Sequence, residues 1–311
     1  MIAPSAMGNS ILIAGRSGRI ARDLIEAADG LGLEVTALGR PDLDLTDRDS
    51  VARVVEGLAP RAIVNAAGLV VVDEAERDPQ HAFAINCDGP AHLAAAAARA
   101  GVPLLHLSSD YVFDGAKMAP YREDDALAPP NVYGRSKAAG EEAVLAAHPG
   151  AIVVRTSWVY GPYGVNFLTT MLRFAAAQDM VRVVADQYGT PTAGADLART
   201  LLEMAVRVAA KPSDVSPGIY HVAGSGETTW FGLAEAIFAG WARRGRRVPK
   251  VQPIPLAEWP GLAARPRDTR LDCSKLERAF GIRLPAWQDS LDQCLDRLAR
   301  DHQEIAAHDE A

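Results

Sequence analysis

The sequence predicts an α/β protein built on a doubly wound parallel sheet of the Rossmann type, with a smaller interleaved α/β region that binds the substrate. Three observations predict this class. Short apolar runs alternate with helical stretches, a glycine-containing turn follows the first run, and the rhythm becomes irregular after about residue 158. Alternating strands and helices favour an open parallel sheet covered by helices on both faces.

The predicted strands are short runs rich in Leu and β-branched residues. Because they are apolar on both faces, they are typical of strands covered on both sides. They lie at residues 11–15, 33–39, 62–68, 102–109 and 151–157. The predicted crossover helices lie at residues 18–30, 47–58, 79–100 and 131–147, and later helices at residues 166–178, 193–210, 229–243 and 287–301.

The change of rhythm predicts two interleaved regions. The dinucleotide-binding domain is expected to comprise residues 11–157 and 188–222, and the substrate-binding region residues 158–187 and 223–301. Residues 1–10 and 302–311 are expected to be flexible tails.

The composition excludes several classes of protein. With 49% hydrophobic and 23% charged residues the chain is globular, and its net charge of −7 argues against a nucleic-acid-binding protein. The basic run at residues 243–247 is interpreted as a solvated helix end. The N-terminus lacks the pattern of a signal peptide, and no apolar run approaches the roughly 20 residues of a membrane span. We therefore expect a cytoplasmic protein with no membrane partner.

The three cysteines, Cys87, Cys273 and Cys294, are widely spaced and odd in number. No CxxC pair or His-rich cluster accompanies them, so we predict neither a disulfide framework nor a metal site built on them.

The turn after the first strand has the pattern GxxGxxA, with Gly15, Ser17, Gly18 and Ala21 in it. Glycine lets the backbone approach a pyrophosphate, and the N-terminus of the following helix favours negative charge. Because the spacing is not GxGxxG, the position of the turn in a βαβ unit carries the prediction of a dinucleotide site. The small residues Ala66, Ala67 and Gly68 at the end of the third strand suit the same ligand.

The end of the second strand indicates which dinucleotide binds. Arg40 stands there, with Arg16 in the glycine turn as support, whereas NAD-selective enzymes often place an acidic residue at this point. Since arginine accommodates a 2′-phosphate, we predict NADPH, with NADH as the alternative. Asp44, followed by Leu45, either flanks the adenine or starts a turn near Thr46.

The predicted proton chemistry runs through Tyr133 and Lys137, which a spacing of four places on one face of a helix. A free phenol has a pKa of about 10, and a nearby ammonium is expected to lower it so that Tyr133 works as a general acid or base. Most YxxxK pairs are only solvated helix faces. Here Ser109 ends the fourth strand, at the edge where open α/β sheets bind ligands, and its hydroxyl can bond a substrate carbonyl.

Taken together, these segments resemble the extended short-chain dehydrogenase/reductase superfamily and, more narrowly, the dTDP-4-dehydrorhamnose reductase family. The resemblance runs from about residue 11 to residue 296. Its most specific segments are LSSDYVFDG at 107–115, PPNVYGRSKAAGE at 129–141 and VVRTSWVYGPYGVNF at 153–167.

The resemblance implies that hydride from NADPH reduces C4 of a 4-keto dTDP-sugar while Tyr133 donates the proton. Lys137 would tune Tyr133 and hold the nicotinamide ribose, and Ser109 would bond the C4 oxygen. Asp110 and Trp158 would contact the sugar nucleotide. The matching cofactor positions are Gly18, Arg19, Ile20, Asp44 and Leu45. His221 is interpreted as a structural residue.

The chain departs from the family pattern at a few positions. Leu69 and Val70 replace residues whose side chains form hydrogen bonds in the family, and Glu74 stands where Lys is frequent. Some members use Mg²⁺ near the first helix, where this chain has Asp23, and the sequence leaves that metal undecided. The oligomeric state also stays open, with a homodimer as one option.

Two other functions fit the same residues. One is reduction of a different 4-keto nucleotide sugar. The other is a non-catalytic NADP-binding regulatory subunit of the same fold, because the fold alone does not prove catalysis. The joint presence of Tyr133, Lys137 and Ser109 favours an enzyme.

Overall fold

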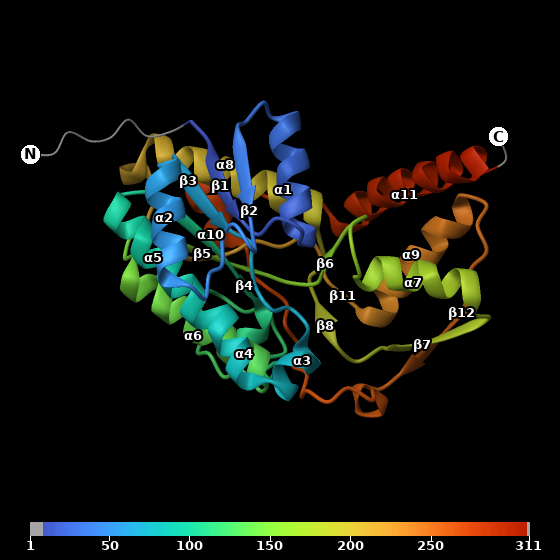
Figure 1. The fold of residues 1–311 in the computed structure, drawn as a ribbon. Coiled ribbons are helices and arrows are strands. Elements are labelled where there is room, and N and C mark those ends of the chain that lie inside the picture. The colour runs from blue at the N-terminus through green and yellow to red at the C-terminus, as the bar shows by residue number, and fades with distance from the viewer. Residues whose placement is uncertain (1–8, 310–311) are drawn as a thin grey trace, which may run out of the picture.

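The computed structural model describes residues 9–309, with side-chain environments for residues 9–300. Its centre is a six-stranded sheet in the order β10-β5-β4-β3-β1-β2, in which every neighbouring pair is parallel (Figure 1). The strands are β1 (Ile11–Ala14), β2 (Val35–Leu38), β3 (Ala62–Asn65), β4 (Leu104–Ser109), β5 (Ile152–Thr156) and β10 (Gly218–His221). The predicted fold class is confirmed, and the first five strands lie inside the predicted runs.

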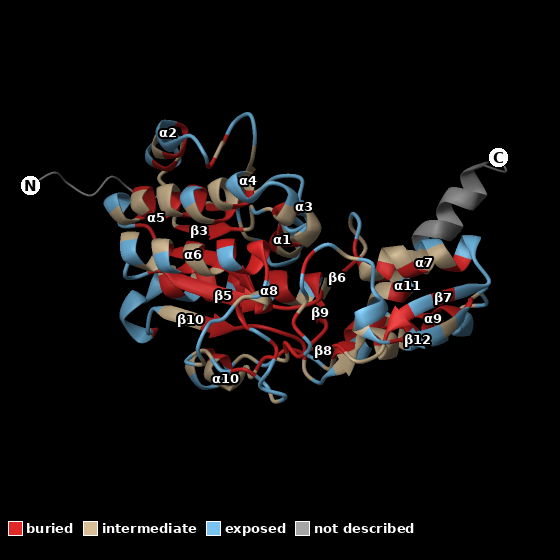
Figure 2. Cartoon of the chain, turned by 90° about the horizontal axis from the view of Figure 1, so that it is seen from below, coloured by how far each residue is buried: buried red, intermediate tan, exposed pale blue. Residues whose placement is uncertain are grey.

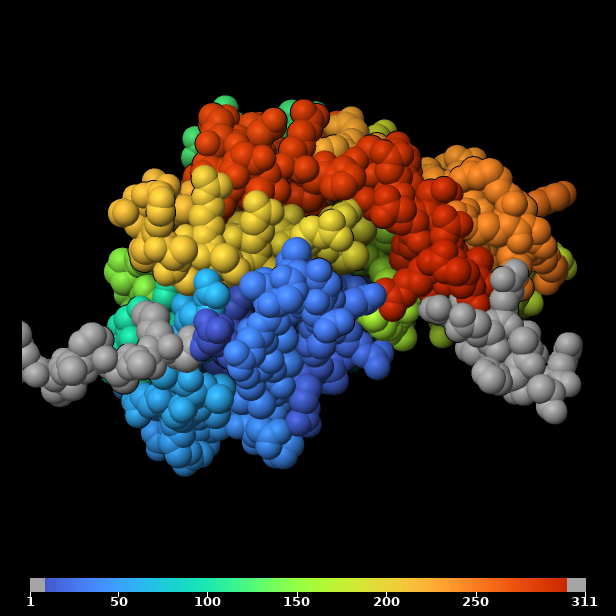
Figure 3. Space-filling view, turned by 90° about the horizontal axis from the view of Figure 1, so that it is seen from above, coloured from blue at the N-terminus to red at the C-terminus, as the bar shows by residue number. Residues whose placement is uncertain are grey.

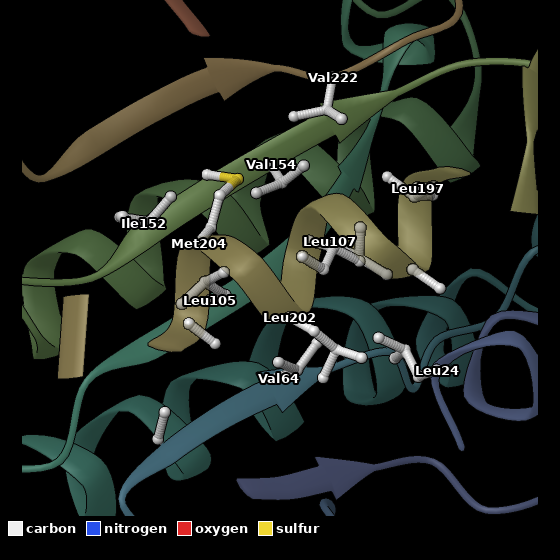
Figure 4. Close-up of a cluster of buried hydrophobic side chains, with 14 of the residues drawn as sticks. Leu24, Val64, Leu105, Leu107, Ile152, Val154, Leu197, Leu202, Met204 and Val222 are labelled. Atoms are coloured by element: carbon white, nitrogen blue, oxygen red, sulfur yellow. The ribbon is translucent and has the colours of Figure 1, made fainter. Parts of the chain in front are cut away.

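Two apolar cores cover the two faces of this sheet, because successive strand residues point to opposite sides. Leu105 and Leu107 of β4 face one core, and Leu104 faces the other. The first core packs under α1 (Arg19–Gly30), α8 (Gly194–Ala210) and α10 (Ser274–Phe280). Figure 4 shows its side chains, with Leu197, Leu202 and Met204 of α8 packed between Val64 and Val154 of the sheet.

The second core lies beneath α2 (Arg48–Leu58), α5 (Gly89–Ala100) and α6 (Val132–Ala147). The helix predicted at 79–100 is interrupted: α4 (Pro79–Phe83) leads into a π-helical segment, η1 (Ala84–Asp88), before α5 begins. At this segment Asn86 turns its side chain inward, where it bonds Leu69 and Ser136. Gly140 of α6 permits this close approach, since a Cβ there would lie 2.0 Å from the Asn86 carbonyl oxygen.

A smaller lobe stands beside the main sheet and has its own core (Figures 1 and 2). It contains α7 (Phe167–Ala177), α9 (Trp230–Arg243), α11 (Trp287–Asp309) and the parallel pair β7 (Met180–Val184) and β12 (Lys250–Ile254). Short strands join the lobes: β6 (Val159–Tyr160), β8 (Tyr188–Gly189), β9 (Thr192–Ala193) and β11 (Thr228–Thr229). The remaining short elements are α3 (Val72–Arg77), η2 (Asp110–Val112), η3 (Pro212–Asp214) and η4 (Leu256–Glu258).

The C-terminal part of the chain crosses from the main lobe to the smaller one, as the red surface in Figure 3 shows. The domain limits deduced from the sequence stay a prediction. The expected tails lie largely outside the described residues, although α11 runs to Asp309. Within the described part of the chain, no helix is long and apolar enough to cross a membrane.

Candidate active site

The carboxyl ends of the parallel strands meet at one edge of the sheet and open onto a cavity of about 330 Å³. In-register pairing places Ser109 at the end of β4 beside Thr156 at the end of β5. The predicted site residues that line this cavity are Arg19, Ile20, Ala66, Ala67, Gly68, Ser109, Asp110, Tyr133, Lys137 and Trp158. The structure thus brings together the whole predicted catalytic set.

The N-terminus of α6 is held in place from several sides, which positions Tyr133. Asn131 caps the helix by accepting a hydrogen bond from the Gly134 amide at 2.7 Å. Glu76 of α3 accepts one from the Val132 amide at 2.7 Å. Gly134 has no space for a side chain, because a Cβ would lie 2.1 Å from the Tyr111 carbonyl oxygen. The first turn of α6 therefore presses directly against the segment that follows Ser109.

Tyr133 is only 9% exposed, and burial raises its pKa to about 12. Hydrogen bonding to Ser109 and the charge of Arg19 lower this pKa, whereas Asp110 raises it. The expectation that Lys137 brings the pKa below its ordinary value is wrong for this structure, because desolvation of the phenolate dominates. The phenol is consequently protonated at neutral pH, as a proton donor must be.

Lys137 lies one turn along the same face and is 5% exposed. Its Nζ donates a hydrogen bond to the Leu107 carbonyl at 2.6 Å. Burial lowers the pKa of Lys137 to about 8, and Glu141 opposes that shift. The side chain is thus close to the point at which it would lose its charge.

Ser109 and Asp110 form a small polar cluster at the end of β4. The Ser109 hydroxyl donates to Asp110 Oδ1 at 3.0 Å and accepts from the Tyr111 amide at 3.2 Å. Asp110 is buried, and this burial raises its pKa to about 7. Hydrogen bonds from Thr269 and Ser109 to the carboxylate oppose that rise. The buried carboxyl lines the catalytic cavity beside Ser109.

Trp158 forms the opposite wall of the cavity and stacks on Trp230, with ring centroids 3.6 Å apart and planes 8° from parallel. Its backbone adopts a φ of 46°, a conformation that costs energy for a bulky residue. Gly189 makes room for the indole, because a Cβ there would lie 2.2 Å from the ring. Sequence reasoning missed Trp230, which is 72 positions further along the chain and belongs to no motif of its own.

The second predicted ligand site is a groove of about 280 Å³ beside the glycine turn. Gly15 has a φ of 116°, and a Cβ on it would lie 3.3 Å from the Ala66 carbonyl carbon, so the turn requires glycine. Ala66, Ala67 and Gly68 line both this groove and the catalytic cavity. The other predicted residues along the groove are Ser17, Gly18, Arg40, Asp44 and Leu45. The groove and the catalytic cavity therefore adjoin each other at the end of β3.

Some predicted cofactor residues have a different environment from the rest. The side chains of Arg19 and Ile20 line the catalytic cavity rather than the groove, and Arg19 donates to the Val159 carbonyl at 3.3 Å. Asp44 accepts two hydrogen bonds from Thr46, so it starts a turn, as one interpretation of the sequence expected. Because it also lines the groove, the interpretation that it flanks the adenine stays a prediction.

The departures from the family pattern concern the loop after β3. Asn86 holds the main chain of Leu69 at both its amide and its carbonyl, at 2.9 and 3.0 Å, without help from the Leu69 side chain. Val70 is 56% exposed and lies at the cavity. The loop is therefore positioned through its backbone.

A further cavity of about 320 Å³ adjoins the catalytic one and shares Tyr111, Phe167 and Trp230 with it. Its lining is mainly apolar, with Arg182, Gln187 and Arg265 among its polar residues. The sequence did not indicate this cavity, because its lining comes from loops and from three separate elements of the smaller lobe, α7, β7 and α9.

The other residues considered from the sequence lie away from this chemistry. His221 is buried beside Phe113, its Nδ1 pairs with the Tyr121 carbonyl, and burial lowers its pKa to about 3. The three cysteines form no disulfide. Among the described residues no group of three or more His, Cys, Asp or Glu side chains could hold a metal ion, and this includes the surroundings of Asp23.

Comparison with known proteins finds one family along almost the whole chain. The family model described as RmlD substrate binding domain matches residues 9–300. A dTDP-4-dehydrorhamnose reductase of Sinorhizobium fredii is 46% identical over 280 residues, which cover 90% of this chain and 94% of that protein. A dTDP-4-keto-6-deoxy-D-glucose reductase of Streptomyces niveus is 38% identical, covering 93% of this chain and 98% of that protein.

A solved structure shows the same architecture. The dTDP-4-dehydrorhamnose reductase of Bacillus anthracis, in complex with NADP, matches with a TM-score of 0.85 and 33% identity. The match covers 94% of this chain and 100% of that one.

Proposed function

This chain belongs to the RmlD substrate binding domain family, and we propose that it works as a dTDP-4-dehydrorhamnose reductase. The reaction converts the C4 keto group of dTDP-4-dehydro-β-L-rhamnose into the hydroxyl of dTDP-β-L-rhamnose, a step in dTDP-rhamnose biosynthesis. The observation that carries this proposal is the convergence of Ser109, Tyr133 and Lys137 in one cavity beside the groove at the glycine turn.

The residues have distinct roles in the proposed mechanism. Bound NADPH supplies the hydride that reduces the carbonyl carbon. Ser109 bonds the C4 oxygen and holds it beside the phenol, and Tyr133 gives its proton to that oxygen as charge develops there. The raised pKa of Tyr133 ensures that this proton is present at neutral pH. Lys137, as an ammonium, stabilises the resulting phenolate and holds the nicotinamide ribose.

The sugar nucleotide is proposed to extend across two cavities. Asp110 and Trp158 contact the sugar in the catalytic cavity. The adjoining apolar cavity suits a thymine ring, and its Arg182 and Arg265 suit a diphosphate. Tyr111, Phe167 and Trp230 line both cavities, so they contact the substrate at the junction.

NADPH is the proposed physiological reductant, with NADH as the alternative. Arg40 lies exposed on the groove at the end of β2, where a 2′-phosphate is expected, and Arg16 bonds the carbonyl of Arg40. The relative from Bacillus anthracis binds NADP. The cytoplasmic location and the oligomeric state stay predictions.

The second candidate is reduction of another 4-keto dTDP-sugar, which the similarity to the Streptomyces niveus reductase favours. Absorbance at 340 nm with NADPH and each of the two 4-keto substrates separates the candidates, and NMR of the product shows the configuration at C4. Turnover of dTDP-4-dehydrorhamnose is the expected result. Turnover of the other sugar alone would refute dTDP-4-dehydrorhamnose as the substrate and support the second candidate. NADPH binding without any turnover would favour the non-catalytic subunit.

A further inference from the structure

Glu141 lies one helical turn beyond Lys137 on α6, so that Tyr133, Lys137 and Glu141 form one stripe facing the sheet. It is 2% exposed and is not part of the cavity lining. We propose that Glu141 is a positioning residue for the reduction: its buried carboxylate keeps Lys137 charged and holds α6 in register with β4. This inference rests on the proposed roles of Tyr133 and Lys137.

The contacts of Glu141 join the three elements that build the site. Arg155 of β5 binds it in a two-pronged ion pair, with Nε 2.9 and 3.1 Å from the carboxylate oxygens and Nη2 at 2.6 Å. The Ser108 hydroxyl of β4 also donates to it, through a short hydrogen bond. Since Ser108 immediately precedes Ser109, this bond ties the helix carrying Tyr133 to the strand carrying Ser109.

The negative charge of Glu141 favours the protonated form of Lys137. The ammonium is buried and donates a hydrogen bond to a neutral acceptor, the Leu107 carbonyl. Burial lowers the pKa of Lys137 to about 8, and Glu141 is the charged group that raises it. Without that carboxylate, desolvation would act unopposed, and the neutral amine could not stabilise a phenolate.

Among the described residues, Glu141 is the charged group that raises the pKa of Lys137. The titratable groups on the elements packed against α6 are Asp73, Glu74, Glu76, Arg77, His81, Cys87, Asp88, His92, Arg99, His106, Asp110, Tyr111 and Arg155, and those on α6 itself include Tyr133, Arg135 and Glu142. Burial and Lys137 together lower the pKa of His106 far below its ordinary value, so His106 is neutral. Arg155 is the partner of Glu141 in the buried ion pair. Asp110 acts on Tyr133 and has a pKa of about 7 itself.

The ion pair can be altered from either side, which separates an electrostatic role from simple packing. Glu141→Gln removes the negative charge and leaves Arg155, so Lys137 should lose its proton at lower pH. Arg155→Lys keeps a cation beside Glu141 but loses the two-pronged geometry, so the pKa of Lys137 should stay in place. If Glu141 has a purely structural role, both variants should lower activity by similar factors at every pH. The pKa of Lys137 should then be unchanged in both.

The test measures Lys137 directly and turnover in parallel. Competitive acetylation with acetic anhydride between pH 6 and 10, followed by mass spectrometry of the Lys137 peptide, reports its titration. For Glu141→Gln we expect the midpoint to fall by one unit or more, and the ratio of turnover at pH 8.5 to that at pH 6.5 to fall about tenfold. Glu141→Asp should restore most of both.

Two outcomes would overturn the inference: an unchanged or raised Lys137 midpoint in Glu141→Gln, or the same downward shift in Arg155→Lys. If Glu141→Gln fails to fold, Glu141→Asp and Ser108→Ala decide. Ser108→Ala keeps both charges, so it should leave the Lys137 midpoint in place while lowering turnover, and a shift there would also contradict the proposal. Failure of the wild type to reduce the keto sugar would refute the proposed function, whereas the acetylation midpoints judge Glu141 separately.

Discussion

Replacement of Asp110 by Asn is expected to stabilise the protein relative to the wild type by an amount that grows as the pH rises from 5 to 8.5. Burial raises the pKa of Asp110 from 3.8 to about 7. Between these values the unfolded chain has an ionised Asp110, whereas the folded protein keeps it protonated. Folding then takes up a proton, so the contribution of Asp110 to stability is lost as the pH rises through 7.

The size of the effect follows from the two pKa values. Each pH unit well inside this interval costs the wild type about 1 kcal/mol or slightly more, so the difference between Asn and Asp should grow by about 2–3 kcal/mol between pH 5 and 8.5. Above pH 7 both states are ionised and the difference levels off. The Asn side chain keeps the oxygen that accepts from Ser109, so the remaining effects of the substitution are constant with pH and cancel in this comparison.

Urea unfolding at pH 5, 6, 7 and 8.5 measures the free energies of both proteins. Asp114→Asn is a suitable control, because hydrogen bonds from Tyr121 and the Ala116 amide hold the pKa of Asp114 below its ordinary value. Its effect should therefore be level over the same pH range. A level difference for Asp110→Asn would refute the reasoning that this buried carboxyl costs the fold stability at neutral pH.

Three further substitutions test other parts of the site. Tyr133→Phe should lower kcat by about 10²–10⁴-fold with NADPH affinity retained, measured by stopped-flow turnover and fluorescence titration, and undiminished turnover would exclude Tyr133 as the proton donor. Gly189→Ala should displace the Trp158 indole and destabilise the fold by about 1–3 kcal/mol in urea unfolding, and it should raise KM for the sugar nucleotide. Gly57→Ala is the control, because a Cβ there meets open space and should leave KM unchanged. Arg40→Ala should raise KM for NADPH about tenfold or more in steady-state assays, as loss of a charged hydrogen bond would, and equal effects on NADH would contradict a 2′-phosphate contact.

Much of the fold could be predicted because its signals are local. The runs around Leu12, Val64 and Leu105 are apolar on both faces, and such runs form strands covered on both sides. The sequence did not predict the break in the helix at 79–100. The π-helical segment there places Asn86 against Leu69 and Ser136. Those partners are 17 and 50 positions away, and no local pattern indicates them.

The residues at the carboxyl edge of the sheet could be named from local patterns alone. Ser109, Tyr133 and Lys137 follow from strand order and helix spacing, and a parallel sheet necessarily gathers its strand ends at one edge. The charge states of these residues depend on the folded environment. Burial raises the pKa of Tyr133, where the sequence predicted a decrease, and Glu141 in its pair with Arg155 opposes the loss of charge on Lys137. Desolvation and ion pairing depend on what surrounds a group in space, and that packing forms only when distant segments come together.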